Sequence, residues 1–375
     1  MAKRIAINGF GRIGRLTLRN LLAKRDIEVV AINDLTDNKT LAHLFKYDSA
    51  QGTYKGKVAA DDKYITIGNK KIVALTERDP SKLPWKKLKV DVVLECTGIF
   101  RTEEKASLHR KAGAKKVVLS APGKGGAIQT IVLGVNDSEL DIKNNIFSNA
   151  SCTTNCLAPV AKILNDNWGI KYGSVNTTHA FTSDQRIQDA PHRDLRRARA
   201  ATVNIIPTST GAAVATGLVV PEVAGKLSAM ALRVPVITGS LVEVNVVLEK
   251  DVTAKEVNAV FQKMSRGKMK GVLEYTEDPI VSSDIIGNKH SSIFDSSLTN
   301  VIGGNFLKVV SWYDNEAGYS ARLADLTAKI AKLSSRKTVV RKKAVAKRTA
   351  TKRTATKKTV AKKATKRTRK TSVAK

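Results

Sequence analysis

The sequence predicts an α/β fold in two parts, with a doubly wound parallel sheet first and a mostly antiparallel sheet covered by helices second. Two patterns carry this prediction. Up to about residue 150, short apolar runs alternate with helical stretches, as in a parallel sheet with helices on both faces. After Asn149, longer strand patterns follow one another with one helical pattern between two of them, as in an antiparallel sheet covered on one face. We therefore expect a first domain over 1–150 and a second over 151–315.

A glycine loop opens the first domain. A short strand over 2–8 leads into GFGRIG at 9–14, a helical stretch runs from Arg12 to about Lys24, and a second strand ends at Asp34. This order is typical of a Rossmann-type dinucleotide-binding unit, whose glycines permit the tight turn, the approach of a pyrophosphate and close helix–strand packing. The helix N-terminus supplies N–H donors to the phosphates. The alternative is a tight turn that binds no ligand.

Asp34 predicts which dinucleotide binds. Its carboxylate would accept hydrogen bonds from ribose hydroxyls, and its charge would repel an added 2′-phosphate. We therefore expect NAD rather than NADP.

The remaining elements follow in order along the chain. The first domain continues with strands VDVVLECTG at 90–98 and KVVLSAP at 116–122 and a helical stretch near 102–112. The second begins with a helix from Ser151 to about Asn167. Its strand patterns are SVNTTHAF, KLSAMALRVPVI, SLVEVNVVLE and FLKVVSWYD, with the helical pattern AKEVNAVFQKMS between the last two. The last helical pattern covers 316–333.

Cys152 is the candidate nucleophile. It lies in SCTTNC at 151–156, where the first helix of the second domain begins. A helix N-terminus stabilises negative charge and lowers the pKa of a thiol, as a nucleophilic cysteine needs. The alternative is that Cys152 only packs the helix start. We expect Cys156, one helical turn further, to be a small buried side chain and Cys96 to belong to the core.

His179 is the candidate base among five histidines, because it ends a strand and precedes a polar loop. It would pair with the cysteine, although a lone histidine is more often structural. Anion sites are indicated by arginines 196, 197 and 199, by the hydroxyls and glycine at 208–211, and by Arg233 within an apolar strand. For Arg196 and Arg199, an interface or surface ion pair is an equal alternative.

Composition excludes several classes of protein. No stretch approaches the roughly 18 consecutive apolar residues of a membrane span, and the N-terminus lacks the pattern of a secretory signal. Three cysteines indicate neither a disulfide framework nor a four-ligand zinc site, so we expect no metal and a reducing, cytoplasmic setting.

The last forty residues differ in kind from the rest. Residues 336–375 hold 18 of the 65 Lys and Arg and no acid, so they supply more than half of the net charge of +32. Small residues and Thr repeat around basic pairs without aromatics, which predicts a disordered basic tail.

The sequence resembles the glyceraldehyde-3-phosphate dehydrogenase family from about residue 2 to 333. The matching stretches are INGFGRIGR, SNASCTTNCLAP, DLRRARAA, NIIPTSTGAA, LRVPV and SWYDNEAGYS. The tail departs from the family and resembles the repeats of histone H1-type proteins.

The resemblance implies a mechanism. Cys152 would attack the aldehyde carbon of glyceraldehyde 3-phosphate while His179 acts as base and, with the Cys152 N–H, steadies the oxyanion. Hydride would pass to NAD, and phosphate would release 1,3-bisphosphoglycerate from the thioester.

The resemblance also implies binding residues. The substrate phosphate would bind Thr182, Arg197 and Arg233. The attacking phosphate would bind Ser151, Thr153, Thr210 and Gly211, near Arg233. Cofactor contacts would come from the loop glycines Gly9, Gly11 and Gly14 and from Arg12, Ile13, Asp34, Arg78, Ser120 and Asn315. The family forms homotetramers, and its final helix packs back on the cofactor domain.

Two other interpretations stay open. Erythrose-4-phosphate dehydrogenase shares the fold, cofactor and Cys–His pair, and differs by releasing a free acid without phosphate. The tail could add non-specific, salt-sensitive nucleic-acid binding. Without aromatics it would not stack bases, and it could equally be solvated and have no partner.

Overall fold

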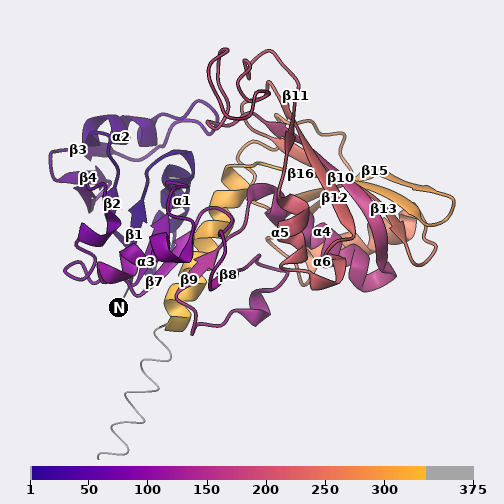
Figure 1. Ribbon diagram of the computed structural model, residues 1–375, viewed down its shortest axis with the longest axis horizontal. Coiled ribbons are helices and arrows are strands. Elements are labelled where there is room, and N and C mark those ends of the chain that lie inside the picture. The colour runs from indigo at the N-terminus through magenta and orange to yellow at the C-terminus, as the bar shows by residue number, and fades with distance from the viewer. Residues whose placement is uncertain (1, 335–375) are drawn as a thin grey trace, which may run out of the picture. The chain divides into compact units, whose positions relative to one another are not determined.

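The computed structural model describes residues 2–334, and the predicted basic tail lies outside these residues (Figure 1). Residues up to Ala328 form one compact unit that contains two sheets. In Figure 1 the two sheets lie on either side of the orange helix that begins at Ala317. Within 2–334, no helix is both long and apolar enough to cross a membrane. The same residues contain no cluster of three or more His, Cys, Asp or Glu suited to a metal.

The first sheet has nine strands in the order β3-β4-β5-β2-β1-β6-β7-β9-β8. Pairing is parallel from β5 to β8 and antiparallel only where β3 and β4 extend the edge, so the predicted doubly wound parallel sheet is confirmed. The strands are β1 (Lys3–Asn8), β2 (Ile27–Asn33), β3 (Val58–Ala60), β4 (Tyr64–Ile67), β5 (Lys70–Leu75), β6 (Val92–Glu95), β7 (Lys116–Leu119), β8 (Ile128–Thr130) and β9 (Ile146–Ser148).

Two of the three helices that follow, all in the first part of the chain, begin at a side-chain cap. α1 (Arg12–Leu22) follows the glycine loop directly. α2 (Asn38–Lys46) is capped by Asp37, and α3 (Glu103–Lys111) by Thr102; each cap accepts a backbone N–H of the first turn. The sequence predicted α1 and α3 but missed α2.

The second sheet has seven strands in the order β11-β12-β10-β13-β16-β15-β14. Four of its six pairings are antiparallel, while β10 with β12 and β14 with β15 are parallel, so it is mostly antiparallel as predicted. The strands are β10 (Ile170–Ala180), β11 (Ile206–Ser209), β12 (Leu227–Val234), β13 (Ser240–Leu248), β14 (Leu273–Thr276), β15 (Ser292–Ile302) and β16 (Phe306–Tyr313).

One face of this sheet is covered by α4 (Cys152–Trp168), α5 (Ala212–Gly217) and α6 (Ala254–Arg266). Residues of β13 alternate between buried and half-buried, and its buried valines share a core with apolar residues of α4 such as Leu157 and Leu164. This alternation is the period-2 pattern that predicted the strand. Three 3₁₀ turns cover Pro80–Lys82, Asp137–Glu139 and Pro221–Val223.

A buried polar chain lies beneath the glycine loop. Trp85 Nε1 donates to His109 Nδ1 at 3.1 Å, and His109 Nε2 lies 2.9 Å from Glu95 Oε2. Because indole only donates, His109 carries its proton on Nε2 and donates to Glu95. Glu95 also accepts from the Asn8 amide at 2.7 Å and from the Thr97 N–H at 2.8 Å.

We expect Glu95→Ala to lower the free energy of unfolding by about 3 kcal/mol, because it leaves several buried donors without an acceptor. The measurement is the thermal midpoint without added cofactor. Glu28→Ala is the control, since the Glu28 side chain is 51% exposed. Equal midpoints for both variants would contradict a structural role for the chain.

Candidate active site

Cys152 is the first residue of α4, and Ser151 caps this helix by accepting the Thr154 N–H at 3.0 Å. The preceding residue, Ala150, has φ 55°, a conformation that non-glycine residues seldom adopt. The Tyr319 hydroxyl donates to the Ala150 carbonyl at 3.0 Å. The turn before Cys152 is therefore fixed by two hydrogen bonds, one to the Ser151 cap and one from Tyr319 to the Ala150 carbonyl.

His179 lies near the end of β10, with Nε2 3.4 Å from Cys152 Sγ. Its Nδ1 donates to the Ala180 carbonyl at 2.7 Å, which leaves Nε2 of the neutral ring as the acceptor that faces the thiol. The Tyr313 ring contacts the imidazole edge-on, and His179 is only 3% exposed. This geometry suits the transfer of the Sγ proton to Nε2.

Burial dominates the titration of this pair. It raises the pKa of the Cys152 thiol, whereas Arg233 and hydrogen bonding to Thr153 act in the opposite direction. Burial and Arg233 together lower the pKa of His179 to about 3, so the imidazole stays able to accept a proton at neutral pH. The sequence predicted a lowered thiol pKa from the helix start alone and was wrong in direction, because burial does not show in the sequence.

We expect Arg233→Met to shift the pH midpoint of Cys152 alkylation upward by roughly one unit, because a nearby cation favours the thiolate. Iodoacetamide labelling at several pH values, followed by mass spectrometry of the Cys152 peptide, measures the shift. Arg199→Met is the matched control, because Arg199 forms an exposed ion pair with Asp189. An unchanged midpoint in Arg233→Met would show that Arg233 does not act on the thiol.

The arginines proposed for the substrate phosphate come from neighbouring segments. Arg233 on β12 is the register partner of His179 on β10, and its Nη1 donates to Thr182 Oγ1 at 3.1 Å. Arg197 forms an ion pair with Asp184 and lies 3.4 Å from Thr208 Oγ1. Sequence reasoning missed Asp184, which nothing in the exposed loop pattern singles out, and its carboxylate would compete with a phosphate for Arg197.

Hydroxyls proposed for the attacking phosphate are partly engaged within the protein. Ser151 Oγ lies 2.7 Å from Thr154 Oγ1, and Thr153 Oγ1 lies 2.9 Å from the Tyr313 hydroxyl. Thr210 accepts the Ala212 N–H at 3.2 Å, and Gly211 precedes α5, which contacts α4. The four residues thus lie at the starts of two touching helices.

A cavity of about 450 Å³ lies above the glycine loop. Asp34 is part of the cavity lining, and its carboxylate accepts the Phe10 N–H at 2.7 Å and the Thr36 N–H at 3.0 Å. Cys96, which the sequence placed in the core, contributes to the lining instead. The lining residues are Asn8, Gly9, Gly11, Asn33, Asp34, Leu35, Glu77, Arg78, Cys96, Thr97, Ile99 and Phe100.

The loop glycines fit a bound dinucleotide. A Cβ on Gly14 would lie 2.3 Å from the Gly9 carbonyl oxygen, and Gly9 itself has φ 90° and abuts Thr97. A Cβ on Gly11 would meet nothing within 4 Å, so this glycine leaves open space in front of the loop. The first N–H groups of α1, including that of Ile13, need acceptors from outside the helix, as a pyrophosphate provides.

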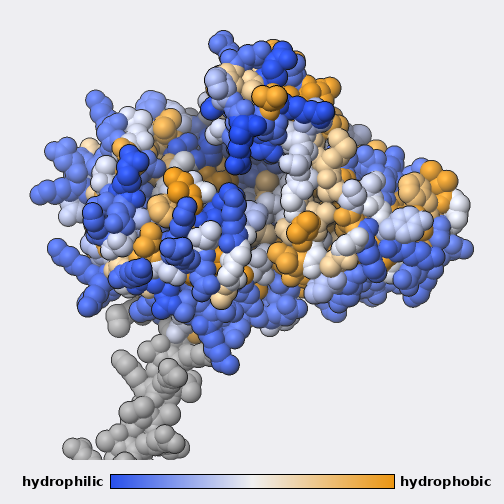
Figure 2. All heavy atoms as spheres, viewed as in Figure 1, coloured by the Kyte–Doolittle hydropathy of each residue, from blue (hydrophilic) through white to orange (hydrophobic). Residues whose placement is uncertain are grey.

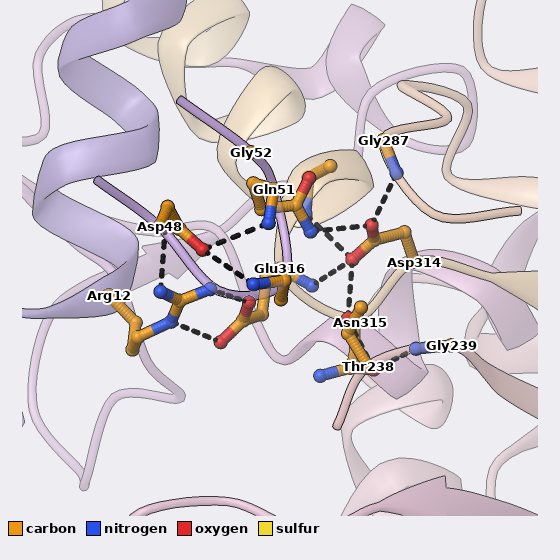
Figure 3. Close-up of polar contacts among 12 residues, drawn as sticks. Arg12, Asp48, Gln51, Gly52, Thr238, Gly239, Gly287, Asp314, Asn315 and Glu316 are labelled. Atoms are coloured by element: carbon orange, nitrogen blue, oxygen red, sulfur yellow. Dashed lines mark hydrogen bonds and ion pairs between the residues drawn. The ribbon is translucent and has the colours of Figure 1, made fainter. Parts of the chain in front are cut away.

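The other proposed cofactor residues lie on separate segments. Ser120 directly follows β7, and its backbone N–H donates to the Glu95 carbonyl at 2.9 Å. Asn315 Oδ1 accepts from the Gly239 N–H at 3.1 Å and the Ser240 hydroxyl at 2.9 Å. Arg12 holds two carboxylates through its guanidinium, as Figure 3 shows.

Comparison with known proteins agrees with both halves of this site. Residues 3–103 match the family described as glyceraldehyde 3-phosphate dehydrogenase, NAD binding domain, and residues 151–315 match its C-terminal domain. Curated relatives named glyceraldehyde-3-phosphate dehydrogenase include those of Thermotoga maritima, 57% identical, and Mycoplasma pneumoniae, 56% identical. The alignments cover 88% of this chain and 99% and 98% of these relatives. Glyceraldehyde-3-phosphate dehydrogenase 1 of Bacillus subtilis is 53% identical over 88% of this chain and 99% of its own length.

Proposed function

Because this chain belongs to the glyceraldehyde-3-phosphate dehydrogenase family, we propose that Cys152 and His179 are the nucleophile and base of its reaction. The enzyme oxidises glyceraldehyde 3-phosphate with NAD and inorganic phosphate to 1,3-bisphosphoglycerate. The observation that carries the residue assignment is the 3.4 Å approach of Cys152 Sγ to His179 Nε2 at the start of α4. Cys156 is fully buried and cannot serve as a second nucleophile.

The chemistry follows from this pair. The Sγ proton passes to Nε2 as sulfur bonds to the aldehyde carbon, and the protonated imidazole and the Cys152 N–H stabilise the oxyanion. NAD, when bound, accepts the hydride that leaves this carbon, which becomes a thioester carbonyl. Phosphate oxygen then bonds to that carbon, the carbon–sulfur bond breaks, and Cys152 departs as a thiolate that His179 reprotonates.

The anion sites complete the proposal. Thr182, Arg197 and Arg233 hold the substrate phosphate, which takes the place of Asp184 on Arg197. Ser151, Thr153, Thr210 and Gly211 receive the attacking phosphate at the N-terminus of α4. Arg233, whose charge favours the Cys152 thiolate, is also proposed to lie near the attacking phosphate.

The cofactor contacts are proposed along the cavity and the loop beside it. Gly9, Gly11, Gly14 and the N–H groups of Arg12 and Ile13 receive the pyrophosphate. Asp34 and Arg78 flank the adenosine, while Ser120 and Asn315 serve the nicotinamide half.

A spectrophotometric assay of the reduced nicotinamide tests the function directly. Turnover of glyceraldehyde 3-phosphate is expected only with NAD and phosphate together. Phosphate-independent turnover to a free acid would instead indicate the erythrose-4-phosphate dehydrogenase type of reaction.

We also propose a homotetramer in the cytoplasm. The loop before β11 exposes Ile187, Leu195, Val203 and Ile205, each at least 69% exposed. Figure 2 shows apolar side chains at the surface of this part of the chain, among hydrophilic neighbours. Exposed apolar groups of this kind mark contact surfaces. The three cysteines are free thiols, as a reducing compartment favours.

For the histone-like tail, which lies outside the described residues, we propose non-specific binding of nucleic acid. Its 18 basic residues without an acid would neutralise phosphates and release counterions. Deletion of residues 336–375 is expected to leave kcat unchanged and to abolish retention on DNA at low salt. Retention of the shortened protein would exclude the tail as the binding element.

A further inference from the structure

The Arg12 side chain is committed to two carboxylates from distant segments (Figure 3). Its Nη1 lies 2.7 Å from Asp48 Oδ2, and its Nε donates to Glu316 Oε1 at 2.8 Å. Nη2 binds the second oxygen of Glu316, so this pair is bidentate. The Asp48 side chain is 2% exposed and that of Glu316 14%, so both charges depend on Arg12 for compensation.

Both carboxylates belong to tightly bonded loops. Asp48 Oδ1 accepts the N–H groups of Ala50 and Gln51, and the Gln51 side chain donates to Asp314 Oδ2 at 2.8 Å. Asp314 Oδ1 accepts the Glu316 N–H at 2.9 Å. Further donors to Asp314 are Thr238 Oγ1, Gly287 N and Ala317 N. Arg12 is therefore joined to the loop at 314–316 by two routes, one directly through Glu316 and one through Asp48 and Gln51.

That loop leads to the proposed base. Asn315 Oδ1 accepts from the Ser240 hydroxyl at 2.9 Å, and Ser240 Oγ accepts the Ala180 N–H at 3.1 Å. The Ala180 carbonyl accepts the proton on His179 Nδ1 at 2.7 Å. A path of hydrogen bonds, joined by short stretches of backbone at 315–316 and at Ala180, thus runs from the first residue of α1 to the imidazole.

We propose that Arg12, through Asp48 and Glu316, is a positioning residue that locks the 314–316 loop against the start of α1. The lock sets Asn315 for the nicotinamide half of the cofactor and His179 for Cys152. This proposal rests on the proposed roles of these three residues. All three guanidinium nitrogens bind these two carboxylates, so we propose that the effect of Arg12 on the cofactor is transmitted through the loop.

Two conservative variants test the lock. Arg12→Lys keeps the charge but loses the bidentate geometry, and Glu316→Gln keeps the shape but loses the charge. Each is expected to weaken NAD binding about 10-fold, the equivalent of one charge-assisted hydrogen bond, as measured by calorimetric titration. Each is also expected to slow iodoacetamide alkylation of Cys152 several-fold without NAD, because the Sγ proton acceptor is displaced. Arg12→Met should exceed Arg12→Lys in both losses.

Lys24→Met is the matched control. Lys24 follows α1 and forms a 2.5 Å ion pair with Asp325 of the final helix, so it also ties α1 to the end of the chain but not to the 314–316 loop. It should retain wild-type NAD affinity and alkylation rate. Equal losses in Lys24→Met would overturn the proposal, as would Arg12 and Glu316 variants that lower only the thermal midpoint.

The experiment separates this proposal from the proposed function. If Cys152→Ala kept full turnover, the nucleophile assignment would fail while NAD titration of the Arg12 variants still tested the lock. If the lock failed, wild-type turnover and its dependence on Cys152 would remain.

Discussion

Cys152→Ala is expected to lower kcat by about 10⁴-fold or more, because removal of a nucleophile eliminates the covalent route rather than one interaction within it. No other cysteine can substitute. Cys152 has His179 Nε2 at 3.4 Å as a proton acceptor, whereas the fully buried Cys156 thiol contacts Ser292 and the Ser311 carbonyl. Burial raises the pKa of Cys96 to about 12. The reduced-nicotinamide assay measures the loss.

Binding of NAD serves as the internal control for this variant. The cavity above the glycine loop is lined by residues of the first sheet and its loops, so the affinity for NAD should change little in Cys152→Ala. Cys156→Ala is the matched substitution one helical turn away and should retain turnover. Residual activity of Cys152→Ala within tenfold of wild type would refute the assignment.

His179→Asn is expected to lower kcat by about 10²- to 10⁴-fold, the usual contribution of a positioned base. An asparagine amide can still donate to the Ala180 carbonyl, as Nδ1 does at 2.7 Å, but it cannot accept the Sγ proton. Because burial and Arg233 lower the pKa of His179 to about 3, the wild-type imidazole is an unprotonated acceptor across the neutral range. The pH dependence near neutrality should therefore follow the thiol.

The alkylation profile of His179→Asn provides the second measurement. Without Nε2, the iodoacetamide reaction of Cys152 should require higher pH, since the thiol must ionise without a local base. His192→Asn, on the polar loop before β11, is a control that keeps the wild-type profile. A profile of His179→Asn that overlies the wild type would show that His179 does not take the Sγ proton.

Much of the fold could be predicted because its signals are local. The glycine loop, the flanking strands and the period-2 alternation of β13 each need only a few neighbouring residues. The edge strands β3 and β4 were missed because three or four residues carry too little periodicity. β15 was missed although it is long, since its second half is exposed or half-buried and its apolar residues Leu298, Val301 and Ile302 do not alternate regularly with polar ones.

The site residues likewise fall into those that local sequence indicates and those that only tertiary contacts reveal. The position of Cys152 at a helix start follows from Ser151 as a cap, and both are read directly from the chain. The sequence singled out His179 among five histidines only by its place at a strand end. Pairing of β10 with β12 places it beside Arg233, and its side chain faces the start of α4. No sequence pattern pointed to Asp184 or Tyr313, because each matters through contacts that form only in the folded chain. Asp184 pairs with Arg197, and the Tyr313 hydroxyl lies beside Thr153.

The sequence by itself determined the family, the glycine loop, the candidate nucleophile and the basic character of the tail, since each follows from adjacent residues. Only the tertiary structure decided the direction of the thiol pKa, the tautomer of His179 and the partners of Arg12. These depend on burial and on contacts between residues as far apart as Arg12 and Glu316, 304 positions along the chain. Such contacts arise from sheet pairing and packing, whose energies are summed over many residues and are not encoded at any one of them.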